Sequence, residues 1–203
     1  MGMPPQDTSS SLSLVVRRLI PAPRDAVFAA WTEPVHLLKW WGPRGVSLAA
    51  AEIDLRVGGR YRLANQYEDG SVLWITGVFE VVDRPRRITY TWAHEPVDDT
   101  TEHTRVTVRF EHRGQDTEVI VVHQGFRSAH SRGTHGAGWG ECLDRLAALA
   151  PCRPADPEYV LPRRAPRHPI TGRARAARVV MAPLPPRISH NRQAGIEPGE
   201  TEP

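Results

Sequence analysis

The middle of the chain carries a long stretch in which apolar and polar residues alternate with a period of two. The stretch runs from Val46 to Gln124, and it is clearest in Thr104 to Phe110, where valines alternate with arginine and threonine. A period of two is typical of strands with one covered and one exposed face, and closely spaced turns favour antiparallel neighbours. The pattern predicts a meander of about six strands. The turn sequences that separate them are Gly58-Gly59, Asp69-Gly70, Arg84-Pro85, Pro96 to Asp99 and Gly114 to Asp116.

The segment before the meander predicts one further strand and two short helices. Leu12 to Ile20 is apolar and β-branched and stops at Pro21-Ala22-Pro23, which predicts a strand. Pro23 and Pro34 then each open a helix, because a proline in the first turn costs little where the N–H has no partner within the helix. The apolar side of the second helix is predicted to be Val35, Leu37, Leu38 and Trp41.

A third helix is predicted after the meander. Four glycines lie in its upstream part, and each costs about 1 kcal/mol relative to alanine inside a helix. Either the helix begins late, near Gly138, or something packs closely against its backbone. The residues at helical spacing are Trp139, Cys142, Leu143, Leu146 and Leu149, and the glycines are Gly133, Gly136, Gly138 and Gly140.

The sheet and the third helix are expected to pack against each other. A one-sided antiparallel sheet must bury its apolar face, and this helix is the largest amphipathic element available to cover it. If the sheet curls around the helix, a cavity remains between them.

Composition divides the chain into one domain and two extensions. Residues 1–150 hold 17 Lys and Arg against 18 Asp and Glu, whereas residues 151–203 hold 9 against 5. The basic segment also contains 11 of the 19 prolines and has no sustained period, so we predict a disordered extension there. The domain is expected over 12–150, after a flexible leader over 1–11, and removing 151–203 should leave the melting temperature nearly unchanged.

No targeting or membrane-spanning segment is evident in the sequence. The start lacks a basic region followed by an apolar run, and no apolar run approaches the roughly 18 residues that a span needs. Cys142 and Cys152 have neither metal spacing nor a secretory context. We therefore expect a reduced, cytoplasmic protein that has no disulfide and no membrane partner.

Two adjacent tryptophans stand at the end of the second predicted helix, in Trp40-Trp41-Gly42-Pro43. Two neighbouring indoles cannot both lie on one helix face, so at least one turns towards something other than the helix's packing partner. We expect one of them, Trp41 in preference, to line a ligand cavity. The alternative is that one packs in the core and the other caps the surface.

The series of residues at the joints of these elements resembles a known family. The residues are Arg17, Pro23, Val27-Phe28, Trp31, Pro34, Trp40 to Pro43, Arg56 to Tyr61, Asp69-Gly70, Gly77, Thr91-Trp92, Thr117, His123 to Phe126, and Gly138-Trp139 before Leu143 and Leu146. Over about 12–150 they resemble the START-like helix-grip superfamily, also called SRPBCC, which includes Bet v-type allergens and polyketide cyclases. Within it, they are similar to the family of activator of heat shock protein 90 ATPase homologues.

The resemblance implies an α+β helix-grip fold, with a curved antiparallel sheet of about seven strands around a long C-terminal helix and two short helices after the first strand. It implies a pocket rather than a particular reaction, because family members include small-ligand carriers, antibiotic-resistance proteins and chaperone activators.

The strand around Tyr61 offers a candidate binding face. Tyr61, Leu63 and Asn65 share this face with Tyr67, while Arg60 and Arg62 face the other way, which suits solvent. The mixture of aromatic surface with amide and phenol groups is typical of a small-molecule site. The complete candidate ligand-binding set is Trp40, Trp41, Tyr61, Leu63, Asn65, Trp74, Trp92, Val121, His123, Phe126, Trp139 and Leu143, of which Trp74, Trp92 and Trp139 are expected to serve the core first.

His123 is the candidate for chemistry. It follows Val119 and Val121 on one strand face and so should point towards the covered side of the sheet. A lone histidine there is most often hydrogen-bonded to a neighbour, but an ordinary histidine pKa would also let it donate a proton to a bound carbonyl.

Several other chemistries have no support in the sequence. Gly136 to Gly140 reads G-x-G-x-G, without the further glycine and the βαβ context of a nucleotide site. The histidines lack a metal-ligand motif, and no nucleophile motif is present. The arginine-rich segment has no interleaved aromatic residues, so we expect no nucleic-acid partner. No metal or other cofactor is implied.

These observations lead to three hypotheses about function. The first is a non-enzymatic module that binds a small hydrophobic or aromatic molecule in an internal cavity, with a role in resistance, detoxification or sensing. The second is a cyclase-like or hydrolase-like enzyme that uses the same pocket with His123 as general acid or base. The third is a chaperone-activating interaction domain. Whether the protein forms a homodimer is left open.

Overall fold

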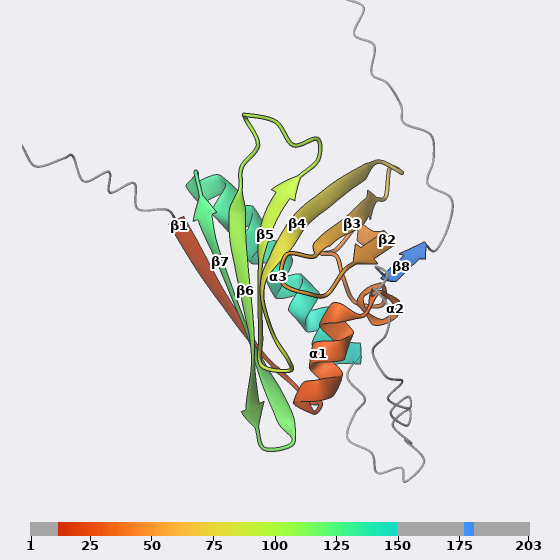
Figure 1. Cartoon of the computed structure of the whole chain (residues 1–203), viewed down its shortest axis with the longest axis vertical. Helices are drawn as coiled ribbons and strands as arrows, with labels where there is room; N and C mark the ends of the chain where they lie inside the picture. The colour runs from red at the N-terminus through yellow and green to blue at the C-terminus, as the bar shows by residue number, and fades with distance from the viewer. Residues whose placement is uncertain (1–11, 150–176, 181–203) are drawn as a thin grey trace, which may run out of the picture.

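The fold is built on an antiparallel sheet that curves around one long helix (Figure 1). The computed structural model describes residues 12–149 and 177–180. The strands are β1 (Leu12–Ile20), β2 (Val46–Ile53), β3 (Arg60–Tyr67), β4 (Val72–Asp83), β5 (Arg87–His94), β6 (Thr104–Arg113), β7 (Asp116–Phe126) and β8 (Ala177–Val180). The helices are α1 (Arg24–Thr32), α2 (Pro34–Leu37) and α3 (Ala129–Leu149).

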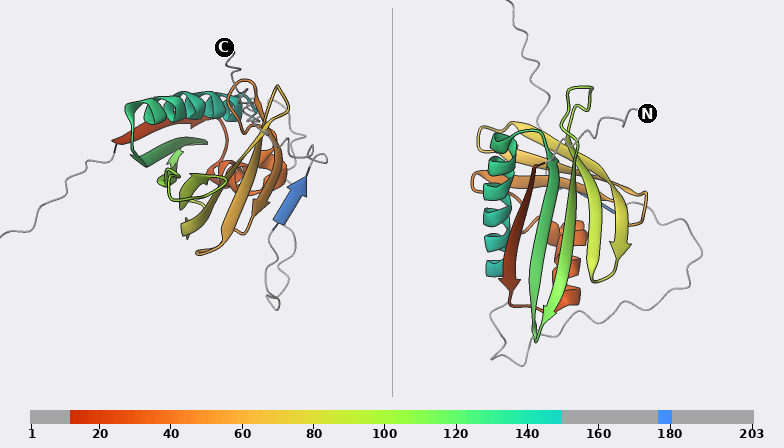
Figure 2. Two further views of the ribbon diagram at one scale, coloured as in Figure 1. Left: turned by 90° about the horizontal axis from the view of Figure 1, so that it is seen from above. Right: turned by 90° about the vertical axis from the view of Figure 1, so that its left-hand side faces the viewer.

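The sheet confirms the seven predicted antiparallel strands. Its order is β1-β7-β6-β5-β4-β3-β2-β8, so β2 to β7 form the predicted meander and β1 returns to pair with β7. The first strand has the predicted bounds. Figure 2 shows α3 lying along the curved sheet beside β1, with α1 on the concave side of the sheet, where it packs against β6 and β7. The helix-grip fold is therefore confirmed.

An eighth strand lies in the segment that we expected to be a disordered extension. Ala177–Val180 forms β8 and pairs antiparallel with Ala50 to Ile53 of β2. The physical reason is the edge of β2, which offers unpaired backbone groups for a further strand. The rest of the predicted extension, and the predicted leader over 1–11, lie outside the described residues.

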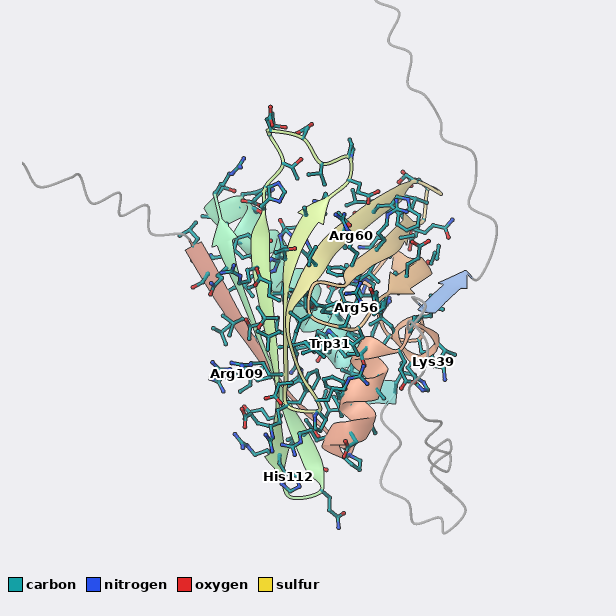
Figure 3. All side chains as sticks on the ribbon, viewed as in Figure 1. Trp31, Lys39, Arg56, Arg60, Arg109 and His112 are labelled. Carbon is teal, nitrogen blue, oxygen red and sulfur yellow. The ribbon has the colours of Figure 1, made fainter. Side chains whose placement is uncertain are left out.

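Alternation along the strands sorts the two faces of the sheet. Val106, Val108 and Phe110 of β6 are buried, whereas Arg105 and Arg109, at alternating positions of the same strand, are exposed. Figure 3 shows Trp31 in the interior, and Arg109 and His112 on the outside. The buried face meets Trp139, Leu143 and Leu146 of α3, which forms the core.

The second helix is shorter than its apolar pattern suggested. It is a single turn, Pro34–Leu37, in which Leu37 is buried but Val35 is 52% exposed. The prediction that Val35 belongs to the apolar side is therefore wrong. One turn of helix can direct only part of its surface inwards, and the chain leaves the helical path before Trp41, which is buried.

The third helix begins nine residues before Gly138, at Ala129. Ser128 caps it, because the Ser128 hydroxyl accepts a hydrogen bond from the Ser131 N–H. A Cβ at Gly133, Gly138 or Gly140 would meet nothing within 4 Å, and one at Gly136 would make only an ordinary contact with Leu14 at 3.7 Å. The start at Ala129 and this open space show that both predictions, a late start and close packing, are wrong. Among the described residues, no helix has the length and apolar character needed to cross a membrane.

Gly77 in β4 marks a close approach between two strands. A Cβ at this position would overlap the carbonyl oxygen of Thr91 and lie 2.7 Å from a ring carbon of Tyr61. The same Thr91 carbonyl accepts a hydrogen bond from the Tyr61 hydroxyl at 2.8 Å, and the Thr91 hydroxyl accepts one from the Val78 N–H at 2.9 Å. Only glycine leaves this junction of β3, β4 and β5 intact.

We predict that Gly77→Ala lowers the free energy of unfolding by about 2–3 kcal/mol, because the methyl group must displace backbone. Gly133→Ala is the matched control, since the space around Gly133 is open and alanine has the higher helix propensity. Urea unfolding of both variants tests the prediction. Equal stability of the two variants would contradict it.

Candidate ligand-binding cavity

A cavity of about 160 Å³ lies between α3 and the concave face of the sheet. Its wall comes from the turn after α2, from β3, β4 and β5, and from α3. Three indoles, those of Trp41, Trp92 and Trp139, contribute to the wall, and each meets the others with ring centroids 5.6 to 6.0 Å apart. The site is therefore mainly aromatic and apolar.

Trp41 and Trp40 take the two different roles that adjacent indoles require. Trp41 lines the cavity, and its Nε1–H donates to Oδ1 of Asn65 at 2.9 Å. Trp40 packs in the core, and its Nε1–H donates to the Ala30 carbonyl at 2.9 Å. The bond to Trp41 fixes the Asn65 amide in the cavity wall, where it is buried among apolar neighbours.

Tyr61 and Leu63 share the buried face with Asn65 but lie deeper. They line a separate internal space of about 20 Å³, which is enough for about one water molecule. Burial, with a smaller effect from Tyr90, raises the pKa of Tyr61 well above its ordinary value, so the phenol is neutral. On the same strand Arg60 is exposed and Arg62 half-buried, as the predicted face assignment requires.

His123 is held by hydrogen bonds at both ring nitrogens. The Trp139 Nε1–H donates to Nδ1 at 3.1 Å, so Nδ1 is unprotonated and Nε2 carries the hydrogen. Nε2–H then donates to the Thr104 hydroxyl at 2.7 Å, and that hydroxyl donates to the Trp92 carbonyl at 3.4 Å. The chain of bonds joins α3 to β7, β6 and β5 through one neutral imidazole.

The pKa of His123 is lowered to about 3, chiefly because burial disfavours the charged ring. The nearby His135 and His94 lower it in the same direction by electrostatic repulsion. With no exposed surface and both nitrogens engaged, the ring has no free position from which to exchange a proton with a ligand. The geometry thus favours the structural role for His123 over the catalytic one.

A second, polar cleft of about 270 Å³ adjoins the cavity. It lies under the loop between β5 and β6 and shares Trp92, His94 and His135 with the cavity wall. The rings of His94 and His135 stack with centroids 5.9 Å apart. The pKa of His94 is lowered by burial and by His135.

Glu102 ties the β5–β6 loop to the start of α3. Its carboxylate accepts hydrogen bonds from the Arg127 N–H and the Ser131 hydroxyl, both at 2.5 Å. Burial works to raise the pKa of Glu102, but these two bonds and the charge of His135 outweigh it and lower the pKa. Within the described residues, no group of three or more His, Cys, Asp or Glu side chains is placed to hold a metal ion.

Trp74 was included in the candidate set wrongly. It lies on the outer face of the sheet, where the guanidinium carbon of Arg62 sits 4.1 Å from the centre of the indole and Ala64 packs beside it. Leu73 and Ile75, its neighbours in β4, are the residues that reach the cavity wall. The error arises because all three are apolar, so a period of two cannot tell which face is covered.

The other candidates divide between the cavity and the core. Trp92 and Trp139 line the cavity. Val121 and Leu143 are fully buried in the core, and Phe126 packs against the rings of His123 and His135.

Sequence reasoning missed His94, His135 and Gly138 in the cavity wall. His94 stands two residues after Trp92 on the same strand face, and His135 stands four residues before Trp139 on α3. Both spacings can be read from the sequence. His135 and Gly138 were missed because they lie in the glycine-rich stretch, where the sequence alone did not show where the helix begins.

The fold and its cavity agree with a comparison against protein families. A family model described as activator of Hsp90 ATPase homolog 1-like protein matches residues 21–150. The chain belongs to this family. Strands β2 to β7, α3 and the cavity between them fall within the matched region of the activator of Hsp90 ATPase homolog 1-like family, whereas β1 and β8 lie outside it.

Solved structures of the same fold come from several bacteria. A protein of Chromobacterium violaceum is 25% identical with a TM-score of 0.63, covering 68% of this chain and 96% of its own. An AHSA1 protein of Silicibacter pomeroyi is 26% identical with a TM-score of 0.61 over the same shares. CalU16 of Micromonospora echinospora is 25% identical with a TM-score of 0.51, covering 68% and 75%. A comparison with curated proteins gave no match.

We predict that His123 makes the fold sensitive to acid. Above pH about 6.5, the ordinary histidine pKa, the ring is neutral in the folded and unfolded chains. Between that value and the folded-state pKa of about 3, the unfolded chain binds a proton that the folded chain does not, so stability is lost as pH falls. From pH 7 to pH 5 the loss through this ring is about 2 kcal/mol.

Urea unfolding at the two pH values measures this loss, and His123→Gln should remove its share of the pH dependence. His112→Gln, at an exposed position on β6, is the matched control and should keep the slope. An unchanged slope in His123→Gln would show that the imidazole does not carry the effect.

Proposed function

We propose that this protein binds a small apolar molecule containing one aromatic ring in the cavity between α3 and the sheet. The observation that carries the proposal is the wall itself, in which Trp41, Trp92 and Trp139 surround about 160 Å³ of space. Indoles supply broad apolar faces, and mainly apolar pockets with few polar groups are typical of small-molecule sites.

The size of the cavity supports a ligand with a single ring. A dry apolar cavity of about 150 Å³ in another protein holds benzene. The cavity here is of similar volume and is bordered by a polar amide, that of Asn65. The cavity shares Trp92, His94 and His135 with the polar cleft under the β5–β6 loop, so a substituent on the ring can extend towards that cleft.

The geometry supports a binding module better than an enzyme that uses His123. That ring is neutral, fully buried and bonded at both nitrogens. Cys142, which also lines the cavity, has its pKa raised to about 11 by burial, so its thiol is not ionised at neutral pH. The family description names an activator of a chaperone ATPase, and no feature of the described residues favours that activity over ligand binding.

We predict that Gly138→Leu abolishes binding while the fold is kept. Gly138 lies in the cavity wall and a Cβ there meets nothing within 4 Å, so a leucine side chain occupies space that the ligand needs. With α-methylstyrene as probe, chemical-shift titration of the indole N–H signals should show saturable binding to the wild type. The dissociation constant of Gly138→Leu should be at least about tenfold higher.

Gly133→Leu is the matched control, because Gly133 is on the same helix and has equally open surroundings but lies outside the cavity wall. Both leucines should stabilise α3 by about 0.8 kcal/mol through helix propensity. Only Gly138→Leu should lose the probe. Binding that survives in both variants would place the site elsewhere.

A further inference from the structure

The indole N–H of Trp92 lacks the hydrogen bond that its neighbours make. Trp40, Trp41 and Trp139 donate to Ala30, Asn65 and His123 respectively. Trp92 is 6% exposed, and its Nε1 is a buried polar atom with no hydrogen-bond partner among the described residues. Such buried donors are rare because the lost bond to water is not replaced.

The position of Trp92 relates this donor to the cavity. Trp92 borders both the apolar cavity and the polar cleft, together with His94 and His135. A molecule in the cavity that reaches towards the cleft therefore passes along Trp92.

Three ring nitrogens of the neighbouring histidines are already hydrogen-bonded. Both nitrogens of His123 are engaged. His135 Nδ1 lies 2.9 Å from the Ser131 carbonyl, which can only accept, so Nδ1 carries a hydrogen that this bond already uses. Of the three indoles that line the cavity in the described part of the chain, Trp92 is the one whose N–H has no hydrogen-bond partner.

We propose, on the basis of the binding function above, that the ligand carries a hydrogen-bond acceptor next to its aromatic ring, and that the Trp92 Nε1–H donates to it. Aryl ketones are the simplest class with this chemistry. A ligand with the acceptor completes the hydrogen bonding of Trp92, whereas a hydrocarbon of the same shape leaves the N–H unpaired, so the site discriminates between them.

Two probes of nearly equal shape test this inference. Acetophenone and α-methylstyrene are both planar and differ in one group, a carbonyl oxygen in place of a methylene. In the wild-type chain the Trp92 indole N–H signal, assigned by its loss in Trp92→Phe, should move downfield with acetophenone and not with α-methylstyrene. The Trp40 signal is the internal control, because that N–H is bonded to Ala30 in the core.

The affinities of the wild type and of Trp92→Phe for the two probes form a thermodynamic cycle that completes the test. The preference for acetophenone over α-methylstyrene should fall about fivefold in Trp92→Phe, which keeps an aromatic ring but removes the donor. Trp92→Phe should still bind α-methylstyrene, which shows that its cavity is intact.

The outcomes separate this inference from the binding function. If both probes bind and the Trp92 signal responds to them alike in the wild type, the acceptor inference is overturned and the cavity function stands. If neither probe binds the wild type, the cavity function is refuted and the inference with it.

Discussion

The indole of Trp139 joins α3 to α1, to the turn after α2, and to strands β5 and β7. It stacks on Trp31 of α1 with centroids 5.8 Å apart, meets Trp41 edge to face at 5.6 Å, and contacts Trp92 of β5. Its N–H fixes the tautomer of His123 on β7. One side chain of α3 thus positions the helix against the sheet and the turn after α2. Because the cavity is bounded by these same rings, its shape follows from the packing of the core.

Much of the fold could be predicted from local patterns. The alternation in β6 and the apolar stripe of α3 are properties of neighbouring residues, and they gave the correct elements and faces. The start of α3 could not be predicted from helix propensity, because the Ser128 cap and the bonds of Glu102 to Arg127 and Ser131 outweigh four glycines. The prediction for Trp74 was wrong because its strand is apolar on both faces, so only long-range packing decides which face of the sheet the indole lies on.

The candidate site was harder to predict than the fold, because its chemistry depends on distant partners. The family resemblance pointed to a pocket, and the double tryptophan placed Trp41 in its wall. The sequence does not show that His123 bonds to Trp139 and Thr104, 16 and 19 residues away. Those bonds turn a candidate acid into a fixed structural group. The rest of the cavity wall consists mainly of indoles and one buried amide, groups that suit the ligand binding that we propose.

The pairing of β8 with β2 has a consequence for the order in which the sheet is completed during synthesis. Ala177–Val180 follows α3 in the chain, so the ribosome makes the seven-stranded part and its helix first. During that interval the backbone groups along Ala50 to Ile53 have no neighbour on the β8 side, and an open strand edge can recruit strands from other chains. Among the described strands β8 is translated last, and its pairing with β2 ends the period in which this edge is open to strands of other nascent chains.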